Sequence, residues 1–414
     1  MTAPEIITLG CRLNLAESQA LAQQLGGEER LIIVNSCAVT NEAVRQTRQA
    51  IRQARRRSPD ARIVVTGCAA QIEPDTFAAM PEIDAVLGNS EKQRPALFGH
   101  GLNQRIRVSD IMAVRETAPH LATAFSGKTR AFVEIQTGCD HRCTFCIIPY
   151  GRGNSRSVPA GAVVDHIAGL VDDGIAEVVL TGVDVTSYGH DLPGAPDLGL
   201  LVERILHYVP ALPRLRLSSV DGVEIDARLF ALLTQEPRLM PHVHLSLQAG
   251  DNLILKRMKR RHNREQAVDL VARLKAARPD IAIGADIIAG FPTEDAAMFE
   301  NSLKLIEDCA IVHGHIFPYS AKTGTPAAKM PPVPSSEIKA RAKLLRDRVK
   351  QSKAAWQNSL HGSMQKIVVE SDGLSGHSEN FAYVEIDMPL PAGTIVAAQI
   401  KGITNGKLQG IVAA

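Results

Sequence analysis

Apolar runs alternate with helix-like stretches in the first part of the chain. Three short apolar runs predict buried strands, at residues 5–10, 31–36 and 62–67. The stretches between them, 13–25 and 41–57, are helix-like and predict helices. This βαβαβ order predicts a parallel sheet with right-handed crossovers.

A cysteine follows each of these three predicted strands directly: Cys11, Cys37 and Cys68. Parallel strands end at one edge of a sheet, and open α/β sheets bind ligands at that edge. We therefore expect three thiols that are far apart in the sequence to converge. The alternative is that these are free structural cysteines, but such residues usually lie inside strands or helices.

A second βα series fills the middle of the chain. Its predicted strands lie at 131–136, 177–182, 214–219, 242–248, 281–288 and 311–317. Each of the first five leads through a loop into a helix-like segment, and the basic stretch 337–353 can supply the sixth helix. Six units are fewer than the eight that close a TIM barrel. The prediction is an α/β fold with an open (β/α)6 partial TIM barrel, whose gap could admit a large substrate.

Beyond the basic helix, short alternating runs separated by Gly, Asp, Asn and Pro predict a small antiparallel β-barrel. We therefore divide the chain into four parts. They are an N-terminal sheet domain at 1–104, a linker at 105–128, the partial barrel at 129–355 and the C-terminal β-barrel at 356–414.

Composition narrows the setting without naming a ligand. The chain of 414 residues has a net charge of +2 and 45% hydrophobic residues, which is typical of a soluble globular protein. It has no basic and apolar leader and no apolar run of about 18 residues, so we expect a cytoplasmic protein without membrane contact. In that reducing compartment, clustered cysteines favour metal binding or catalysis over disulfides.

Basic residues are concentrated in a few places. Six arginines and no acid lie between Ala43 and Arg57, and four of them repeat at helical spacing: Arg45, Arg48, Arg52 and Arg55. Two further clusters lie at 256–264 and 337–353. Each of the three could be an ordinary solvated face. Three in one nearly neutral chain favour a phosphate-bearing macromolecule such as RNA.

The most informative stretch is "GCDHRCTFCIIPYGRG" at 138–153. Cys139, Cys143 and Cys146 form a Cys-x3-Cys-x2-Cys pattern, and three soft thiolates favour an iron–sulfur cluster or zinc. Zinc would need a fourth ligand, and His141 is awkwardly placed to supply it. A four-iron cluster held by three thiolates leaves one iron open for chemistry. A plain electron-transfer cluster is a further alternative.

This stretch resembles the signature of radical S-adenosylmethionine (SAM) enzymes, and its flanks resemble their methylthiotransferase branch. Motifs similar to that branch cover nearly the whole chain: "TLGCRLN" (8–14), "IVNSCAVT" (33–40), "VTGCAAQ" (65–71), "TGVDVTSYG" (181–189), "LSLQAGDN" (245–252) and "DIIAGFPTE" (286–294). The tail resembles a TRAM domain. Its net charge over 362–414 is −2, from three lysines and five acids, which is unexpected in a domain that grips RNA.

The resemblance implies two [4Fe-4S] clusters and SAM as cofactors. Cys139, Cys143 and Cys146 would hold the radical-generating cluster, and Cys11, Cys37 and Cys68 would hold a second cluster that carries the sulfur. The residues implied to contact SAM are Phe145, Gly182, Asp184, Ser246, Gln248 and Gly290. Ordinary barrel packing is the alternative for each of these six. It is also the expectation for Cys309, His242 and His244.

The branch contains groups that act on isopentenyladenosine in tRNA, on threonylcarbamoyladenosine in tRNA and on a ribosomal-protein aspartate. "TLGCRLN" and the 138–153 stretch are most similar to the threonylcarbamoyladenosine group. The implied partners are the anticodon stem-loop of tRNA, an electron donor such as a flavodoxin or ferredoxin, and a sulfur donor. The competing hypothesis from another class is a non-catalytic iron–sulfur or zinc protein that binds RNA.

Overall fold

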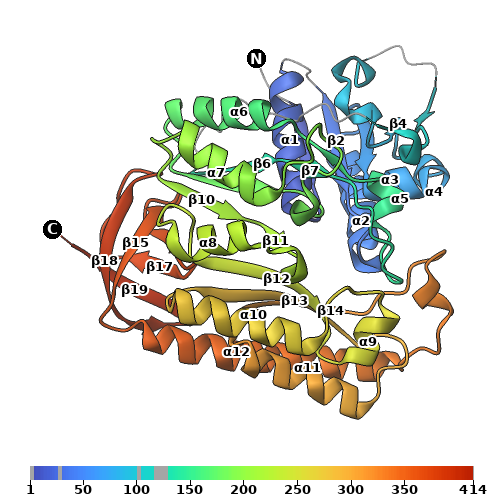
Figure 1. Cartoon of the computed structure of the whole chain (residues 1–414). Coiled ribbons are helices and arrows are strands. Elements are labelled where there is room, and N and C mark those ends of the chain that lie inside the picture. Colours follow the sequence, from blue (N-terminus) through green and yellow to red (C-terminus); the bar gives the residue numbers. More distant parts are fainter. Residues whose placement is uncertain (1–3, 27–29, 100–103, 116–128, 414) are drawn as a thin grey trace.

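The computed structural model describes residues 4–26, 30–99, 104–115 and 129–413. They form an N-terminal sheet domain, an open barrel and a small C-terminal β-barrel, joined as Figure 1 shows. Among these residues, no helix combines the length and the apolar character needed to cross a membrane.

The N-terminal domain is a five-stranded parallel sheet in the order β1-β2-β3-β4-β5. Its strands are β1 (Glu5–Thr8), β2 (Leu31–Ser36), β3 (Arg62–Gly67), β4 (Ala85–Leu87) and β5 (Ile106–Arg107). Its helices are α1 (Arg12–Gln24), α2 (Asn41–Arg57), α3 (Cys68–Ile72) and α4 (Pro74–Ala78). The three predicted strands and both predicted helices are present. β4 and β5 are additional, and β5 shows that the sheet extends into the predicted linker, whose residues 116–128 lie outside the described part.

The two long helices cover opposite faces of this sheet. Leu21 of α1 packs with Ile33 of β2, whereas Ile51 of α2 packs with Ile32, on the other side of the same strand. Because β1, β2 and β3 follow one another in one direction, helices on opposite faces give the two crossovers opposite hands. The prediction that both are right-handed is therefore wrong for one of them. Helix α1 also contacts β6 of the barrel, so it lies between the two domains.

The middle of the chain forms the predicted open barrel. Its parallel strands are β6 (Arg130–Glu134), β9 (Glu177–Thr181), β10 (Arg214–Leu217), β11 (Ser219–Val220), β12 (His242–Gln248), β13 (Ala282–Ala289) and β14 (Ile311–Pro318). The third predicted strand is split at Ser218 into β10, which pairs with β9, and β11, which pairs with β12. No pairing joins β6 to β14 among the described residues, so one side stays open.

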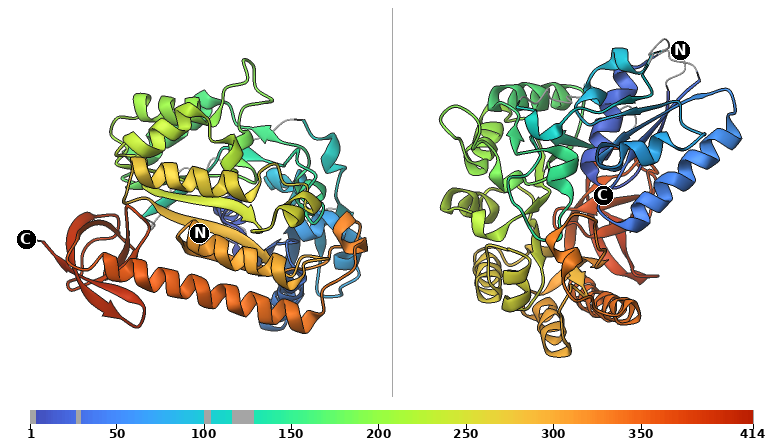
Figure 2. Two further views of the ribbon diagram at one scale, coloured as in Figure 1. Left: turned by 60° about the horizontal axis from the view of Figure 1, so that its bottom comes forward. Right: turned by 90° about the vertical axis from the view of Figure 1, so that its right-hand side faces the viewer.

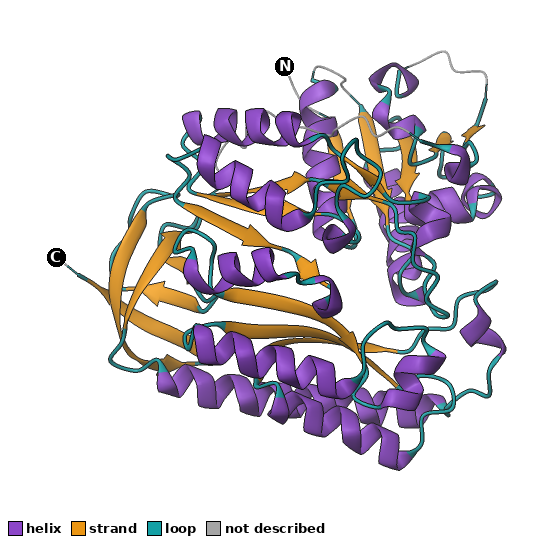
Figure 3. Cartoon of the chain, viewed as in Figure 1, coloured by secondary structure: helices purple, strands orange, loops and turns teal. Residues whose placement is uncertain are grey.

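Helices cover the outside of this barrel, and Figure 3 shows them outside the strands. They are α6 (Ala160–Asp172), α7 (Leu198–Tyr208), α8 (Ala227–Gln235), α10 (Arg264–Ala277), α11 (Ala296–Asp308) and α12 (Ser335–Ser359), while the short α9 (Asn252–Arg257) lies at the carboxyl end of β12. A short helix α5 (Ile148–Arg152) and a two-stranded pair, β7 (Gln136–Thr137) with β8 (Arg156–Ser157), follow β6. The main core lies between strands and helices.

The C-terminal domain is a closed barrel of five strands in the order β15-β16-β17-β19-β18. The strands are β15 (Met364–Val369), β16 (Ser375–Ser378), β17 (Tyr383–Ile386), β18 (Ile395–Thr404) and β19 (Lys407–Val412). The prediction of an antiparallel barrel is wrong at one pairing, because β17 and β19 run parallel. The long α12 leads into this domain, as the left view of Figure 2 shows, and it ends beyond the predicted boundary at 356.

The C-terminal barrel closes the lower end of the open barrel, where the parallel strands begin. Arg216 on β10 donates to the carbonyl oxygens of Glu379 (3.1 Å) and Ser378 (3.3 Å), and its guanidinium lies 4.8 Å from the Phe381 ring. Glu370 of β15's end accepts from Thr129 (3.0 Å) and forms an ion pair with Arg130. The carboxyl ends of the barrel strands therefore remain the free end.

Glu177, a fully buried acid, holds three arginines together at this lower end. Its carboxylate binds Arg216 through two hydrogen bonds of 3.0 Å and lies 3.7 Å from Arg130 and 3.8 Å from Arg214. Burial raises the pKa of Glu177, but the Arg216 charge and hydrogen bonds, with Arg130 and Arg214, outweigh it and hold the pKa below its usual value. The carboxylate therefore stays charged and is the common counter-ion of these guanidinium groups.

We expect Glu177→Gln to lower the free energy of unfolding by about 3–5 kcal/mol, because it leaves buried guanidinium groups without their counter-charge. Urea unfolding followed by circular dichroism measures the change. The matched control is Glu203→Gln, which alters an exposed pair with Arg228 and should cost less than about 0.5 kcal/mol. Equal stability losses in the two variants would contradict this role of Glu177.

Candidate functional site

The structure brings Cys11, Cys37 and Cys68 together at the carboxyl edge of the N-terminal sheet. Gly10 makes the approach possible: its φ is +95°, and a Cβ atom there would lie 2.6 Å from the Cβ of Cys37. Burial, together with the nearby Cys68 and Cys11 thiols, raises the pKa of Cys37 to about 11. Cys37 and Cys68 are buried, whereas Cys11 is exposed, so this group of thiols, the N-terminal trio, has one side accessible.

The second group, which we call the loop trio, consists of Cys139, Cys143 and Cys146 on the loop between β7 and α5. Thr144 fixes this loop, because its N–H donates to the Met258 carbonyl (3.1 Å) and its hydroxyl donates to the Arg257 carbonyl (2.8 Å). Burial, together with the Cys143 thiol, raises the pKa of Cys146 to about 12. The loop trio lies at the carboxyl end of the first barrel strand.

The two trios face each other across the domain interface. Helix α5 packs on helix α3, and a Cβ atom on Gly151 would lie only 3.1 Å from the Cβ of Cys68. Asn89 spans this contact, since its amide donates to the Gly151 carbonyl and lies 3.8 Å from the Cys68 sulfur. The Cys68 thiol also raises the pKa of Cys146 in the other trio. Glycine at 151 therefore permits the two cysteine groups to approach one another.

A buried charge network, which the sequence reasoning missed, ties these elements together. Arg152 of α5 binds Glu17 of α1 (2.8 Å) and donates to the Asn14 side chain (2.6 Å), and Lys92 binds the same Glu17 at 2.6 Å. Burial lowers the pKa of Arg152, but Glu17 and the Cys68 and Cys11 thiols outweigh it and raise the pKa well above its usual value. The signal in the sequence was an arginine between two glycines in the cysteine motif.

The residues present fit a multi-iron cluster better than a single ion. Sulfurs around one zinc ion, each about 2.3 Å from it, lie about 3.8 Å apart. In the described part of the chain, the sets of three potential ligand atoms within 4.8 Å of one another include neither trio of sulfurs. Two buried cations, Arg152 and Lys92, also share Glu17 beside the N-terminal trio, which suits a centre carrying negative thiolates.

One such set does include Cys139, together with His141 and Asp184. His141 Nε2 lies 3.0 Å from Asp184 Oδ2, and the Cys139 thiol donates to the same oxygen at 3.5 Å. The Asp184 hydrogen bond raises the pKa of His141. Sequence spacing placed His141 awkwardly for a ligand, but its ring reaches a residue predicted to contact SAM. Asp184 is thus oriented at the loop trio before any ligand binds.

Gln136, another residue the sequence reasoning missed, organises the loop that carries Asp184. Its side-chain oxygen accepts from the backbone N–H groups of Asp184 (2.9 Å) and Val183 (3.1 Å). A Cβ atom at Gly182 would lie 2.7 Å from the Gln136 carbonyl oxygen, so glycine is required there by packing. The need for glycine at position 182 is therefore explained by packing, independently of any contact with SAM.

The other residues predicted to contact SAM divide into two kinds. Phe145 packs edge-on against Phe291 with 6.4 Å between ring centres, and a Cβ atom at Gly290 would lie 2.6 Å from Ile338 of α12, so both serve packing. Ser246 and Gln248 lie at the carboxyl end of β12. The Ser246 carbonyl accepts from Arg260, whose guanidinium lies 3.9 Å from the Cys143 sulfur.

The sequence predicted ordinary packing for His244 and Cys309, and the structure confirms it for one of them. His244 has a partner that the sequence did not show: its Nε2 lies 3.0 Å from Asp286 Oδ1, which also lies 3.1 Å from His315 Nδ1. The expectation of plain packing is therefore wrong for His244. Cys309 lies buried in the main core, as the sequence analysis expected, and burial raises its pKa to about 12.

The four arginines predicted to bind RNA each have an acidic partner. Arg45 pairs with Glu42 (2.6 Å), Arg48 with Glu73 (3.5 Å), Arg52 with Glu82 (3.9 Å) and Arg55 with Asp84 (2.6 Å). Arg55 also donates to the carbonyls of Pro59, Ala61 and Glu82, so it stabilises its own domain. Exposed pairs of this kind are weak and exchange readily, so RNA binding by the others stays a prediction.

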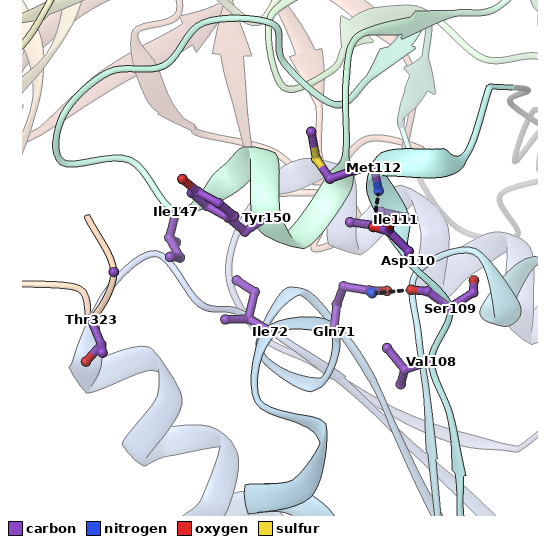
Figure 4. Close-up of a pocket in the computed structure, with 11 residues that line it drawn as sticks. Gln71, Ile72, Val108, Ser109, Asp110, Ile111, Met112, Ile147, Tyr150 and Thr323 are labelled. Carbon is purple, nitrogen blue, oxygen red and sulfur yellow. Dashed lines mark hydrogen bonds between the residues drawn. The ribbon is translucent and has the colours of Figure 1, made fainter. Parts of the chain in front are cut away.

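A groove lies beside the site and is shown in Figure 4. It is lined by Gln71 and Ile72 of α3, by Ile147 directly before α5 and Tyr150 of α5, and by residues 108–112 and 323–324. Gln71 donates to the Ser109 carbonyl across it (2.9 Å). None of its lining residues is a cysteine, so it flanks the two trios without containing them.

Comparisons with known proteins agree with this arrangement. The radical SAM superfamily matches residues 133–306, and the uncharacterized protein family UPF0004 matches residues 4–88. These two matches contain the loop trio and the N-terminal trio respectively. In fold, the radical S-adenosylmethionine methyltransferase TsrM of Kitasatospora setae is similar, with a TM-score of 0.52 and 18% identity over 77% of this chain and 67% of its own.

Relatives at higher identity cover nearly the whole chain. The threonylcarbamoyladenosine tRNA methylthiotransferase MtaB of Rickettsia prowazekii is 48% identical over 99% of this chain and 97% of its own length. The tRNA-2-methylthio-N(6)-dimethylallyladenosine synthase of Cereibacter sphaeroides is 32% identical over 98% of this chain and 97% of its own. With two cysteine trios in the expected places and these matches, the chain belongs to the radical SAM methylthiotransferase family.

Proposed function

We propose that this chain inserts a methylthio group at C2 of N6-threonylcarbamoyladenosine at position 37 of tRNA. The observation that carries the proposal is the apposition of the two cysteine trios, made by Gly151 packing on Cys68. The 48% identity to a protein named for threonylcarbamoyladenosine supports this substrate over isopentenyladenosine and over a ribosomal-protein aspartate.

The two trios each hold one [4Fe-4S] cluster in this proposal. When bound, the cluster on Cys139, Cys143 and Cys146 supplies the electron that cleaves SAM to a 5′-deoxyadenosyl radical, and the cluster on Cys11, Cys37 and Cys68 supplies the sulfur. A radical that removes hydrogen from an unactivated carbon must be kept close to its target. The packing of α3 on α5 supports this by fixing the distance between the two trios.

The surrounding residues prepare the site. Arg152 and Lys92 offset negative charge at the N-terminal trio, and Glu17 holds both of them in place. Asp184, held by His141 and by Ser187 (2.9 Å), presents a carboxylate beside the loop trio, where it can bind the amino group of SAM. The C-terminal barrel covers the end where the barrel strands begin, so the nucleoside enters at the carboxyl ends of the strands, where the two trios lie.

Three partners complete the proposal. An electron donor such as a flavodoxin or ferredoxin reduces the radical-generating cluster, and a sulfur donor renews the transferred sulfur. The anticodon stem-loop of tRNA is the substrate, and the reaction takes place in the cytoplasm. Two of the five acids of the C-terminal barrel are paired with a cation, Glu370 with Arg130 and Glu385 with Lys407, so the five repel RNA less than their number implies.

Alanine substitutions of single cysteines separate the two proposed clusters. Cys143→Ala should abolish SAM cleavage under dithionite and methylthiolation. Cys37→Ala should retain SAM cleavage but lose methylthiolation, with iron falling from about eight to about four per chain in each variant. Metal analysis and mass spectrometry of tRNA nucleosides, from cells lacking the protein and complemented with each variant, measure these outcomes.

Cys309→Ala is the matched control for these variants, because Cys309 is a buried cysteine outside both trios. It should retain the iron, SAM cleavage and the methylthio mark. Methylthiolation that survives in Cys37→Ala contradicts the second-cluster assignment. Zinc without iron in the unmodified protein contradicts the whole proposal and favours the non-catalytic RNA-binding class.

Arg152→Gln tests the charge network beside the N-terminal trio. We expect it to lower stability by about 3–5 kcal/mol, since it leaves Glu17 with one fewer buried cation. It should also release iron from the N-terminal trio while the loop trio still supports SAM cleavage. Chelator-induced iron loss, followed by absorbance, measures this effect. Iron loss equal to that of the unmodified protein contradicts the role given to Arg152.

The double variant Arg45→Gln/Arg52→Gln tests the basic face of α2. If both side chains exchange their acid partners for phosphates, the variant weakens binding of an anticodon stem-loop and lowers the salt-dependence slope by up to ~2. Fluorescence anisotropy across a salt series measures the slope. The control is Arg273→Gln, an exposed arginine paired with Asp269 on α10. An unchanged slope in the double variant assigns these arginines to an ordinary solvated face.

A further inference from the structure

Arg12, the residue directly after Cys11, extends its side chain from the start of α1 into the lumen of the open barrel. Its guanidinium lies 5.6 Å from the ring centre of Phe132 on β6 and 5.6 Å from that of Phe381. These two rings belong to different domains, and Arg12 lies against both. The position of the Arg12 side chain is therefore set by the open barrel and by the C-terminal barrel together.

The arginines at the start of the barrel strands have carboxylate partners, whereas Arg12 has no ion-pair partner among the described residues. Arg130, Arg214 and Arg216 all share Glu177, and Arg130 also pairs with Glu370. The side chain of Arg12 makes no hydrogen bond and no ion pair with any residue in the described ranges. The like charges of Arg130 and Arg216 act on Arg12, and the charges of Glu177 and Asp286 act on it in the opposite sense. Arg12 is half-buried, and a guanidinium without an ion-pair partner is well suited to receive an anion.

A second observation also indicates a ligand in this part of the lumen. His242 is only 5% exposed, and neither of its ring nitrogens has a hydrogen-bond partner. Its ring centre lies 5.0 Å from that of Phe381 and 5.2 Å from that of His313, whose Nε2 also lacks a partner. Buried polar atoms without partners are rare in native structures, so each needs an explanation. The unpartnered ring nitrogens of His242 and His313 therefore indicate that a polar ligand binds inside the barrel.

Glu177 and Asp286 are the carboxylates whose charges act on Arg12, and both are already engaged, Glu177 by three arginines and Asp286 by two histidines. The Asp286 Oδ1 atom lies 3.0 Å from His244 Nε2 and 3.1 Å from His315 Nδ1. Arg12 and Asp286 interact only through their electric fields, without an ion pair within 4 Å in the structure. The lumen thus presents a guanidinium without an ion-pair partner on one wall and a carboxylate held by two histidines on another.

We propose that Arg12 binds the carboxylate of the threonine-derived side chain of the substrate nucleoside. This inference rests on the proposed function, because threonylcarbamoyladenosine carries a carboxylate on its N6 substituent whereas isopentenyladenosine carries only a hydrocarbon. A guanidinium recognises a carboxylate through two parallel hydrogen bonds, which a hydrocarbon cannot make. Arg12 is then a specificity-determining residue, and the nucleoside's side chain points down the lumen.

Substrate analogues test the inference without changing the protein. Anticodon stem-loops are prepared with threonylcarbamoyladenosine at position 37 and with its carboxamide, which has the same shape but no charge. Binding to the reconstituted enzyme, without SAM, is measured by fluorescence anisotropy. We expect the enzyme to bind the acid about 10- to 100-fold more tightly than the amide. Equal affinities for the two stem-loops overturn the inference.

Protein variants provide the complementary test. Arg12→Gln should bind the acid as weakly as the unmodified enzyme binds the amide, with amide binding unchanged, and Arg12→Lys should recover part of the preference. Arg228→Gln, an exposed arginine on α8, is the control and should keep the full preference. If Arg12→Gln weakens both stem-loops equally, its role is structural or directed at the RNA backbone, and the inference fails.

Turnover separates this inference from the proposed function. If the unmodified enzyme with SAM and dithionite does not methylthiolate the acid stem-loop, the proposed function fails. If it methylthiolates the acid and the amide with equal kcat/KM, the proposed function stands and the role of Arg12 fails. Iron content and thermal unfolding of Arg12→Gln are checked first, because Arg12 adjoins Cys11.

Discussion

The buried network of Arg152, Glu17 and Lys92 is the interaction on which the arrangement of the site depends. Glu17 belongs to the N-terminal domain and Arg152 to the barrel, and both side chains are 3% exposed. A displacement of one domain against the other would leave buried charges unpaired, which is far more costly than losing an exposed pair. The network therefore favours one docking of the two domains, and this docking brings the two cysteine trios face to face. Close packing at Gly151 then sets how near they come.

A second buried carboxylate, Glu177, has the corresponding role at the opposite end of the barrel. It holds Arg216 toward the carbonyl oxygens of the C-terminal barrel, which covers the end of the open barrel where the strands begin. The lumen lies between these two networks. Its upper end meets the loop trio, and its lower end is lined by charged and aromatic side chains. An open barrel of six βα units can thus enclose a small part of a large RNA, because the C-terminal barrel covers one end and the carboxyl ends of the strands stay free.

The sequence predicted what depends on long, regular patterns. The six barrel strands and the first three strands of the N-terminal sheet are apolar runs with cysteines or turns at their ends, so their positions and the convergence of Cys11, Cys37 and Cys68 could be derived. β4 and β5 have three and two residues, which is too short for any periodicity. The partners of Arg152 and His244 lie 135 and 42 residues away. Such pairings depend on how domains and strands pack, so the local sequence can single out Arg152 but cannot identify its partners.

The start of α1 joins the chemistry of the site to the recognition of the substrate. Cys11 precedes the helix and belongs to the N-terminal trio, and Arg12, its first residue, reaches into the lumen. Because a helix is stiff and α1 is buried between the sheet and β6, these two adjacent residues cannot move independently. A nucleoside whose side chain is bound at Arg12 would therefore be held at a fixed position relative to the sulfur source. Substrate recognition by Arg12 and sulfur transfer at Cys11 are then coupled because the two residues are neighbours in the chain.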